Sequence, residues 1–168
     1  RVFMRYVGLP GSAEQLARNH QATLDQILAQ TCPNPNGVGV TSLRYTSNQL
    51  RERQSHRVRA GGGINLRQCS QIEGVGHVNR RPNFQVDFRN NQAGRRLEFR
   101  VRGVQNCNTV LLVRTPSGRW RFNDDYGNTV HARIRLNRAE AGTYRVWVGT
   151  FGPNACNATF SMVTANPG

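Results

Sequence analysis

The chain has 168 residues, which is enough for one domain with a hydrophobic core and too few for two full domains. Apolar residues make up 37% of it, and 17 glycines with frequent short apolar runs favour a β protein over a helical or disordered chain. The formal net charge is +14, from 23 basic and 9 acidic residues, and this excess favours polyanionic partners.

All of the basic residues are arginine. A GC-rich genome that replaces lysine with arginine would explain this without any function. Guanidinium groups also bind phosphate, sulfate and carboxylate through paired hydrogen bonds, and they stay charged when partly buried. An all-arginine surface therefore also suits a fixed anionic partner.

Residues 1–45 are expected to form an N-terminal segment ahead of the main domain. Residues 2–7 are an apolar run that predicts a short strand or extended arm. Ser12 can cap an amphipathic helix over residues 13–30, which Pro33 would end. Residues 31–39, TCPNPNGVG, have the composition of a linker.

Residues 46–168 are expected to form a mainly β domain. After residue 40, short apolar segments alternate with polar residues at roughly ten-residue spacing, with glycine and asparagine in the turns. This pattern predicts an antiparallel sandwich or barrel. The clearest predicted strands are residues 84–88, 97–101, 109–113, 130–136, 144–148 and about 158–163.

Five arginines alternate with apolar residues in these strands, so their side chains should point away from the core. If the strands are neighbours, these arginines form one basic sheet face, diluted only by Glu98 and Glu140; the alternative is an ordinary solvated surface. The candidate anion- or partner-binding residues are Arg100, Arg102, Arg133, Arg135 and Arg145.

Residues 107–149 contain an ordered set of short motifs. An apolar strand leads into TPSGRW, which predicts a hairpin; NDDYGN follows, and then the strand GTYRVWVG. In this order the motifs resemble the bacterial pre-peptidase C-terminal domain family, and the resemblance extends over about residues 56–165. It implies a jelly-roll-like β-sandwich without catalytic activity, exported and usually appended to secreted enzymes. It also implies adhesion to substrate or matrix and, in some branches, calcium binding.

Four cysteines, widely spaced and without a CxxC pair, predict two disulfides in an oxidising compartment. Three pairings are possible, and we expect Cys69 with Cys107 and Cys32 with Cys156. The alternative is four free thiols in a cytosolic protein. The start at Arg1 fits a chain whose signal peptide has been removed, or an excised piece. A periplasmic or secreted protein is expected.

The oxygen-rich loop at Asn123, Asp124 and Asp125 offers ligands that calcium prefers, although a turn that bonds its own backbone explains the same residues. Calcium is the one cofactor that the sequence suggests. The four histidines lie in unrelated segments, and no GxSxG, HExxH or P-loop motif is present. We therefore expect no enzyme activity.

These observations favour a non-catalytic, exported binding module that recognises an anionic polysaccharide, lipopolysaccharide or an acidic protein. Nucleic acid is a less favoured partner, because the expected disulfides place the chain where nucleic acid is scarce. The alternative function is a structural subunit of an extracellular or cell-envelope assembly, docked through the N-terminal arm. No apolar stretch approaches the roughly 20 residues that would span a bilayer.

Overall fold

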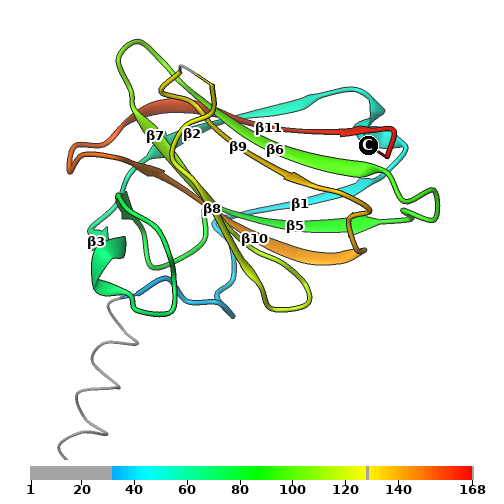
Figure 1. The fold of residues 1–168 in the computed structure, drawn as a ribbon, viewed down its shortest axis with the longest axis horizontal. Helices are drawn as coiled ribbons and strands as arrows, with labels where there is room; N and C mark the ends of the chain where they lie inside the picture. The colour runs from blue at the N-terminus through cyan, green and yellow to red at the C-terminus, as the bar shows by residue number, and fades with distance from the viewer. Residues whose placement is uncertain (1–31, 128, 168) are drawn as a thin grey trace, which may run out of the picture.

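Two β-sheets pack face to face in the computed structural model, which describes residues 32–127 and 129–167 (Figure 1). The fold is therefore a mainly β sandwich, as the sequence predicts. The predicted N-terminal strand and helix, and with them the proposed docking arm, lie outside the described residues. In the described part of the chain, no helix is long and apolar enough to cross a membrane.

The larger sheet has seven strands, and its main path runs β1-β5-β10-β4-β3, with β7 beside β10 and β8 beside β7. Its β1 runs parallel to β5, whereas the other pairs of this sheet are antiparallel. The strands are β1 (Thr41–Thr46), β3 (Ile64–Asn65), β4 (His77–Val78), β5 (Phe84–Arg89), β7 (Thr109–Arg114), β8 (Trp120–Asn123) and β10 (Gly142–Thr150).

The smaller sheet has four strands in the order β2-β11-β6-β9, all antiparallel. Two short 3-10 helices, η1 (Gln49–Arg51) and η2 (Leu66–Gln68), lie in the connections of the sandwich. The strands of the smaller sheet are β2 (Gln54–Ala60), β6 (Arg96–Gly103), β9 (Ala132–Leu136) and β11 (Cys156–Ala165).

All six of the clearest predicted strands are present, as β5, β6, β7, β9, β10 and β11. The expectation of an antiparallel fold holds except for β1, which pairs with β5 in parallel. β1 and β2 lie at the ends of their sheets and carry few apolar residues, so their alternation is weak. β1 also crosses residue 45, where the sequence analysis places the end of the N-terminal segment.

Aromatic side chains fill the space between the sheets. The rings of Phe84 and Phe160 stack at a centroid distance of 4.6 Å, and each comes from a different sheet. Tyr144 is fully buried, and its hydroxyl donates to the Glu140 carbonyl at 2.6 Å, which fixes the start of β10. A second apolar cluster, centred on Trp147, covers part of the outer side of the larger sheet, over β4, β7 and β10. On β1 of the same sheet, Thr41, Ser42 and Arg44 stay exposed.

The two disulfides are Cys32–Cys69 and Cys107–Cys156, with sulfur–sulfur distances of 2.14 Å and 2.00 Å. The prediction of two disulfides is confirmed, but the expected pairing is wrong. β6 and β11 are antiparallel, so the turn after β6, with Cys107, lies beside Cys156 at the start of β11. Cys32 and Cys69 both pack in the cluster on the other side of the larger sheet. The spacing of the cysteines along the chain does not reveal which strands are neighbours, so the pairing cannot be predicted from that spacing.

Candidate anion-binding face

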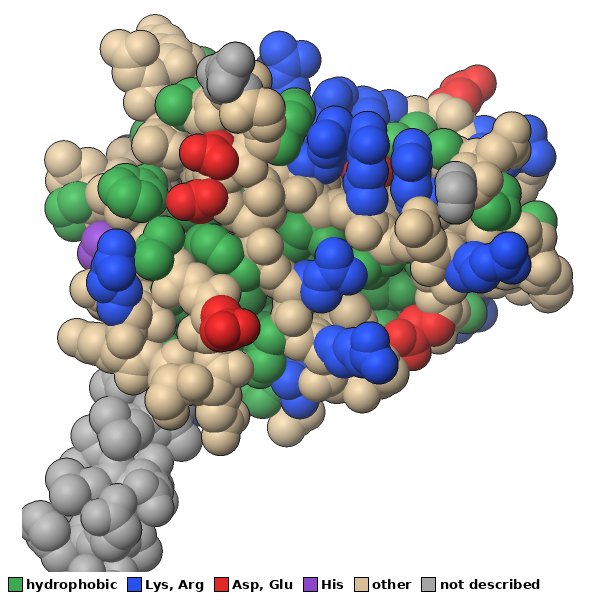
Figure 2. Space-filling model, in the orientation of Figure 1, with side chains coloured by type: hydrophobic (Ala, Val, Ile, Leu, Met, Phe, Trp, Pro, Cys, Tyr) green, Lys and Arg blue, Asp and Glu red, His purple; other side chains and the backbone are tan. Residues whose placement is uncertain are grey.

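The outer surface of the smaller sheet is lined with arginine. Along β6, Leu97, Phe99 and Val101 are fully buried in the core, so the alternate residues point outward. The same alternation operates in β2 and β9. We call the resulting surface the arginine face; its members are Arg57 and Arg59 on β2, Arg96, Arg100 and Arg102 on β6, Arg133 and Arg135 on β9, and Arg53 just before β2. Figure 2 shows basic side chains gathered over this sheet in the upper part of the view.

The four strands of this sheet contain one carboxylate, Glu98, and it is already bound. Its side chain is 8% exposed, and its two oxygens accept hydrogen bonds from Arg53 Nη2 at 2.8 Å and from Arg135 Nε at 3.1 Å. Burial raises the pKa of Glu98, but the hydrogen bonds and charges of the two arginines outweigh burial and hold it below its usual value. Glu98 is therefore ionised at neutral pH and neutralises part of the charge beside it.

The remaining arginines of the face lack such a partner. Among the described residues, no carboxylate lies within ion-pairing distance of Arg100 or Arg102. Arg100 is partly buried, and its Nε is shielded from solvent without a hydrogen-bond acceptor. Arg133, directly opposite Arg100 in the register, places its guanidinium 4.3 Å from the centre of the Tyr126 ring. The middle of the face thus holds positive charge that no described carboxylate neutralises.

A shallow hollow of about 360 Å³ opens on this face between β2, β11 and β6. Three arginines, two serines and a threonine line it, which places several hydrogen-bond donors around one space. The lining residues are Arg53, Ser55, Arg100, Arg102, Gly103, Val104, Thr159 and Ser161.

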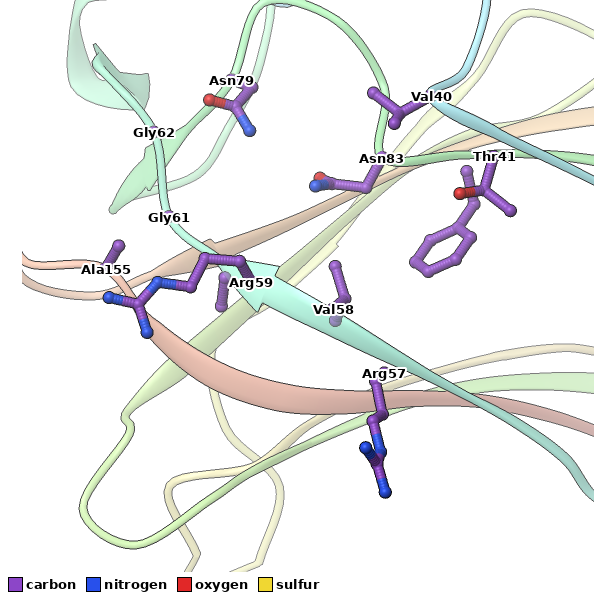
Figure 3. Close-up of a pocket in the computed structure, with 12 residues that line it drawn as sticks. Val40, Thr41, Arg57, Val58, Arg59, Gly61, Gly62, Asn79, Asn83 and Ala155 are labelled. Carbon is purple, nitrogen blue, oxygen red and sulfur yellow. The ribbon is translucent and has the colours of Figure 1, made fainter.

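A different pocket, of about 460 Å³, opens at the side of the sandwich between β2 and the start of β1. Figure 3 shows Val58 pointing from β2 toward Asn83 and Val40, whereas the Arg57 side chain leaves the opposite side of the strand. This pocket lies at the β2 edge of the smaller sheet, and Arg57 and Arg59 of the arginine face are among the residues that line it.

Of the five predicted binding residues, four lie together on the arginine face and Arg145 does not. Arg145 is on β10 of the larger sheet, opposite Arg114, and its Nε donates to the Gly37 carbonyl at 2.7 Å. The prediction of one shared face is therefore wrong for Arg145, because β10 and β6 belong to different sheets. Arg53, Arg57, Arg59 and Arg96 also lie on the face but are not among the predicted residues; the alternation of β2 is weak, and its place beside β11 cannot be read from the sequence.

The predicted calcium loop has one of its three ligands otherwise engaged. Asn123 Oδ1 accepts a hydrogen bond from the Arg133 amide at 3.0 Å. Asp124 is half-buried and Asp125 is exposed. No group of three or more histidine, cysteine, aspartate or glutamate side chains placed to hold a metal occurs within residues 32–127 and 129–167. Calcium binding at this loop stays a prediction.

Two histidines have defined partners. His56 Nε2 lies 2.9 Å from the Tyr45 hydroxyl, and burial lowers the pKa of His56. His131 Nδ1 accepts the Gly103 amide at 3.1 Å, so His131 is neutral in this contact. Burial lowers the pKa of His131, and the charges of Arg102 and Arg100 lower it further. The pKa of His131 therefore depends on the charge of the arginine face.

The fold and this surface define a β-sandwich with one strongly basic sheet face. No protein-family model matches the chain, and no curated protein matches it. Among solved structures, the pre-peptidase C-terminal domain of collagenase from Bacillus anthracis is 13% identical, with a TM-score of 0.44. PliG from Aeromonas hydrophila, a periplasmic inhibitor of g-type lysozyme, is 10% identical, with a TM-score of 0.43. Each similarity covers 76% of this chain and 98% of the other. Membership of the pre-peptidase C-terminal family stays a prediction.

Proposed function

We propose that this protein is a non-catalytic, exported binding module whose arginine face holds an anionic polymer. One observation supports this most directly: four adjacent strands present seven outward arginines against one carboxylate, Glu98, which two arginines already occupy. Ordinary solvated surfaces mix charges of both signs. A surface this one-sided attracts polyanions and repels cations.

The arginines of the face favour direct hydrogen bonds to a bound anion over long-range electrostatic attraction alone. Guanidinium groups bind phosphate, sulfate and carboxylate through paired hydrogen bonds and are less strongly hydrated than an ammonium group. Arg100 and Arg102 have no ion-pair partner among the described residues, so their donors are available to a ligand. The two disulfides fit an exported protein, and anionic polysaccharide is the polymer class we favour there.

Amide chemical-shift mapping with dextran sulfate tests this proposal. We expect the shifts to concentrate on β2, β6, β9 and β11 and to reverse when salt is added, because counterions compete for the arginines. Amides of β5 and β7, which lie in the other sheet, serve as the internal reference. Shifts spread evenly over both sheets would show that only net charge matters, and they would overturn the proposal.

A further inference from the structure

The hollow on the arginine face brings together donors of two kinds. Ser55, Ser161 and Arg100 form one row across β2, β11 and β6, because Ser161 is the register partner of both others. Thr159 is likewise the partner of Arg102 in the next outward row. All five line the hollow. A group placed there would therefore meet hydroxyls from one side and guanidinium groups from the other.

Hydrogen bonds to Ser161 and Glu98 hold the Arg53 side chain in place at one side of the hollow. Arg53 donates through Nη1 to Ser161 Oγ at 2.8 Å and through Nη2 to Glu98 at 2.8 Å. Because the Ser161 oxygen accepts from Arg53, its own hydroxyl hydrogen stays available to donate. The Ser55 and Thr159 hydroxyls line the hollow without a hydrogen bond to any described residue. The site therefore offers donors that need little rearrangement.

Arg100 adds a charge that lacks compensation. Its Nε is shielded from water and has no acceptor in the described part of the chain, and the nearest carboxylate on its strand, Glu98, is bound by two other arginines. A partly desolvated cation without a counterion is unfavourable. An anion in the hollow would remove this cost by bringing a negative charge beside Arg100.

The number and arrangement of donors indicate the chemistry of that anion. A carboxylate is planar, and one guanidinium fork satisfies its two oxygens. A phosphate or sulfate monoester has three terminal oxygens that point in different directions, so it can accept from both guanidinium groups and hydroxyls. We propose that the hollow is a subsite for a phosphate or sulfate monoester carried on a polysaccharide. This inference rests on the proposed function and names the group that the face selects.

A polysaccharide suits this position better than a membrane surface. Arginines continue along the face on both sides of the hollow, with Arg57 and Arg59 on β2 and Arg135 on β9, so an extended chain could follow them. The large exposed apolar residues of the described chain are Val38, Val40, Val104, Val130 and Phe151. Val104 alone of these lines the hollow, which leaves little apolar surface there to enter a bilayer.

The test removes hydroxyls and leaves every charge in place. The variant Ser55→Ala/Thr159→Val is compared with wild type and with a matched control, Thr41→Val/Ser42→Ala, on exposed positions of β1 in the other sheet. Affinities are measured for dextran sulfate, phosphorylated dextran and carboxymethyl dextran of equal degree of substitution. We expect wild type and control to prefer the sulfated and phosphorylated polymers, and the hollow variant to lose about tenfold in affinity for these two only.

The outcomes separate the two proposals. Equal affinity of wild type for all three polymers, or unchanged affinities in the hollow variant, would overturn the subsite while leaving the arginine face as a binding surface. Wild-type binding to none of the three would overturn the proposed function itself. Tighter binding to phosphatidic acid vesicles than to phosphorylated dextran at equal phosphate concentration would overturn the assignment to a polysaccharide.

Discussion

Arg100 on β6 lies directly opposite Arg133 on β9, so two like charges face each other across neighbouring strands. Like charges at opposite positions destabilise an antiparallel pair. The Arg133 guanidinium lies over the face of the Tyr126 ring. No described carboxylate pairs with Arg100. Repulsion between the two arginines therefore lowers the stability of the free protein, and a bound anion would offset this repulsion.

Arg100→Gln should leave folding stability unchanged or raise it by about 0.5 kcal/mol, because it relieves repulsion with Arg133 and keeps most of the side-chain stem. The same variant should bind dextran sulfate more weakly. Urea unfolding measures the first effect and a binding titration the second. A stability loss above about 1 kcal/mol would mean that Arg100 has a structural role that the contacts described above do not account for.

Glu98→Gln should lower the free energy of unfolding at pH 7 by about 2 kcal/mol, because it weakens two charge-assisted hydrogen bonds to Arg53 and Arg135. The pKa of Glu98 is lowered in the folded state, so its contribution is present above the unfolded value of about 4.3 and is lost as pH falls through the folded pKa. The difference between wild type and variant should therefore shrink below about pH 4.

Glu73→Gln is the matched control for that experiment, since Glu73 is exposed and lies outside the smaller sheet. It should change stability little at any pH. Equal effects of the two substitutions would contradict a specific role for Glu98 beneath the arginines.

Peptide mapping without reduction should recover two cross-linked pairs, Cys32 with Cys69 and Cys107 with Cys156. Cys107→Ser/Cys156→Ser should lower stability by about 3 to 4 kcal/mol, because the lost bond closes a separation of 49 residues in the unfolded chain. Recovery of a Cys69–Cys107 peptide would contradict the strand order at the end of the smaller sheet.

The pKa of His131 should rise when dextran sulfate binds. Burial lowers this pKa, as do the charges of Arg102 and Arg100, and a polyanion on the face would offset the second contribution. A titration of the His131 ring followed by NMR measures the change. His56 is the control, because burial alone lowers its pKa. Equal changes at both histidines would argue against a local anion at the face.

Alternation and apolar runs along single strands predict β5 to β7 and β9 to β11, and alternation says which of their arginines point outward. These patterns do not say which strands are neighbours. The sequence therefore places Arg145 on the wrong surface and does not place Arg57 and Arg59 on the face, because β2 joins the face only through its pairing with β11. The disulfide pairing failed for the same reason, since Cys107 and Cys156 meet through the antiparallel pairing of β6 and β11.

The dependence of dextran sulfate affinity on salt, compared between two variants of equal net charge, tests the central claim most directly. One is Arg100→Gln/Arg102→Gln/Arg133→Gln on the arginine face. The other is Arg67→Gln/Arg80→Gln/Arg119→Gln, at exposed positions outside the smaller sheet. We expect the face variant to bind at least about tenfold more weakly, with the slope of log affinity against log salt reduced by about 3, and the other variant to stay close to wild type. Equal losses in both variants would contradict a localised binding face.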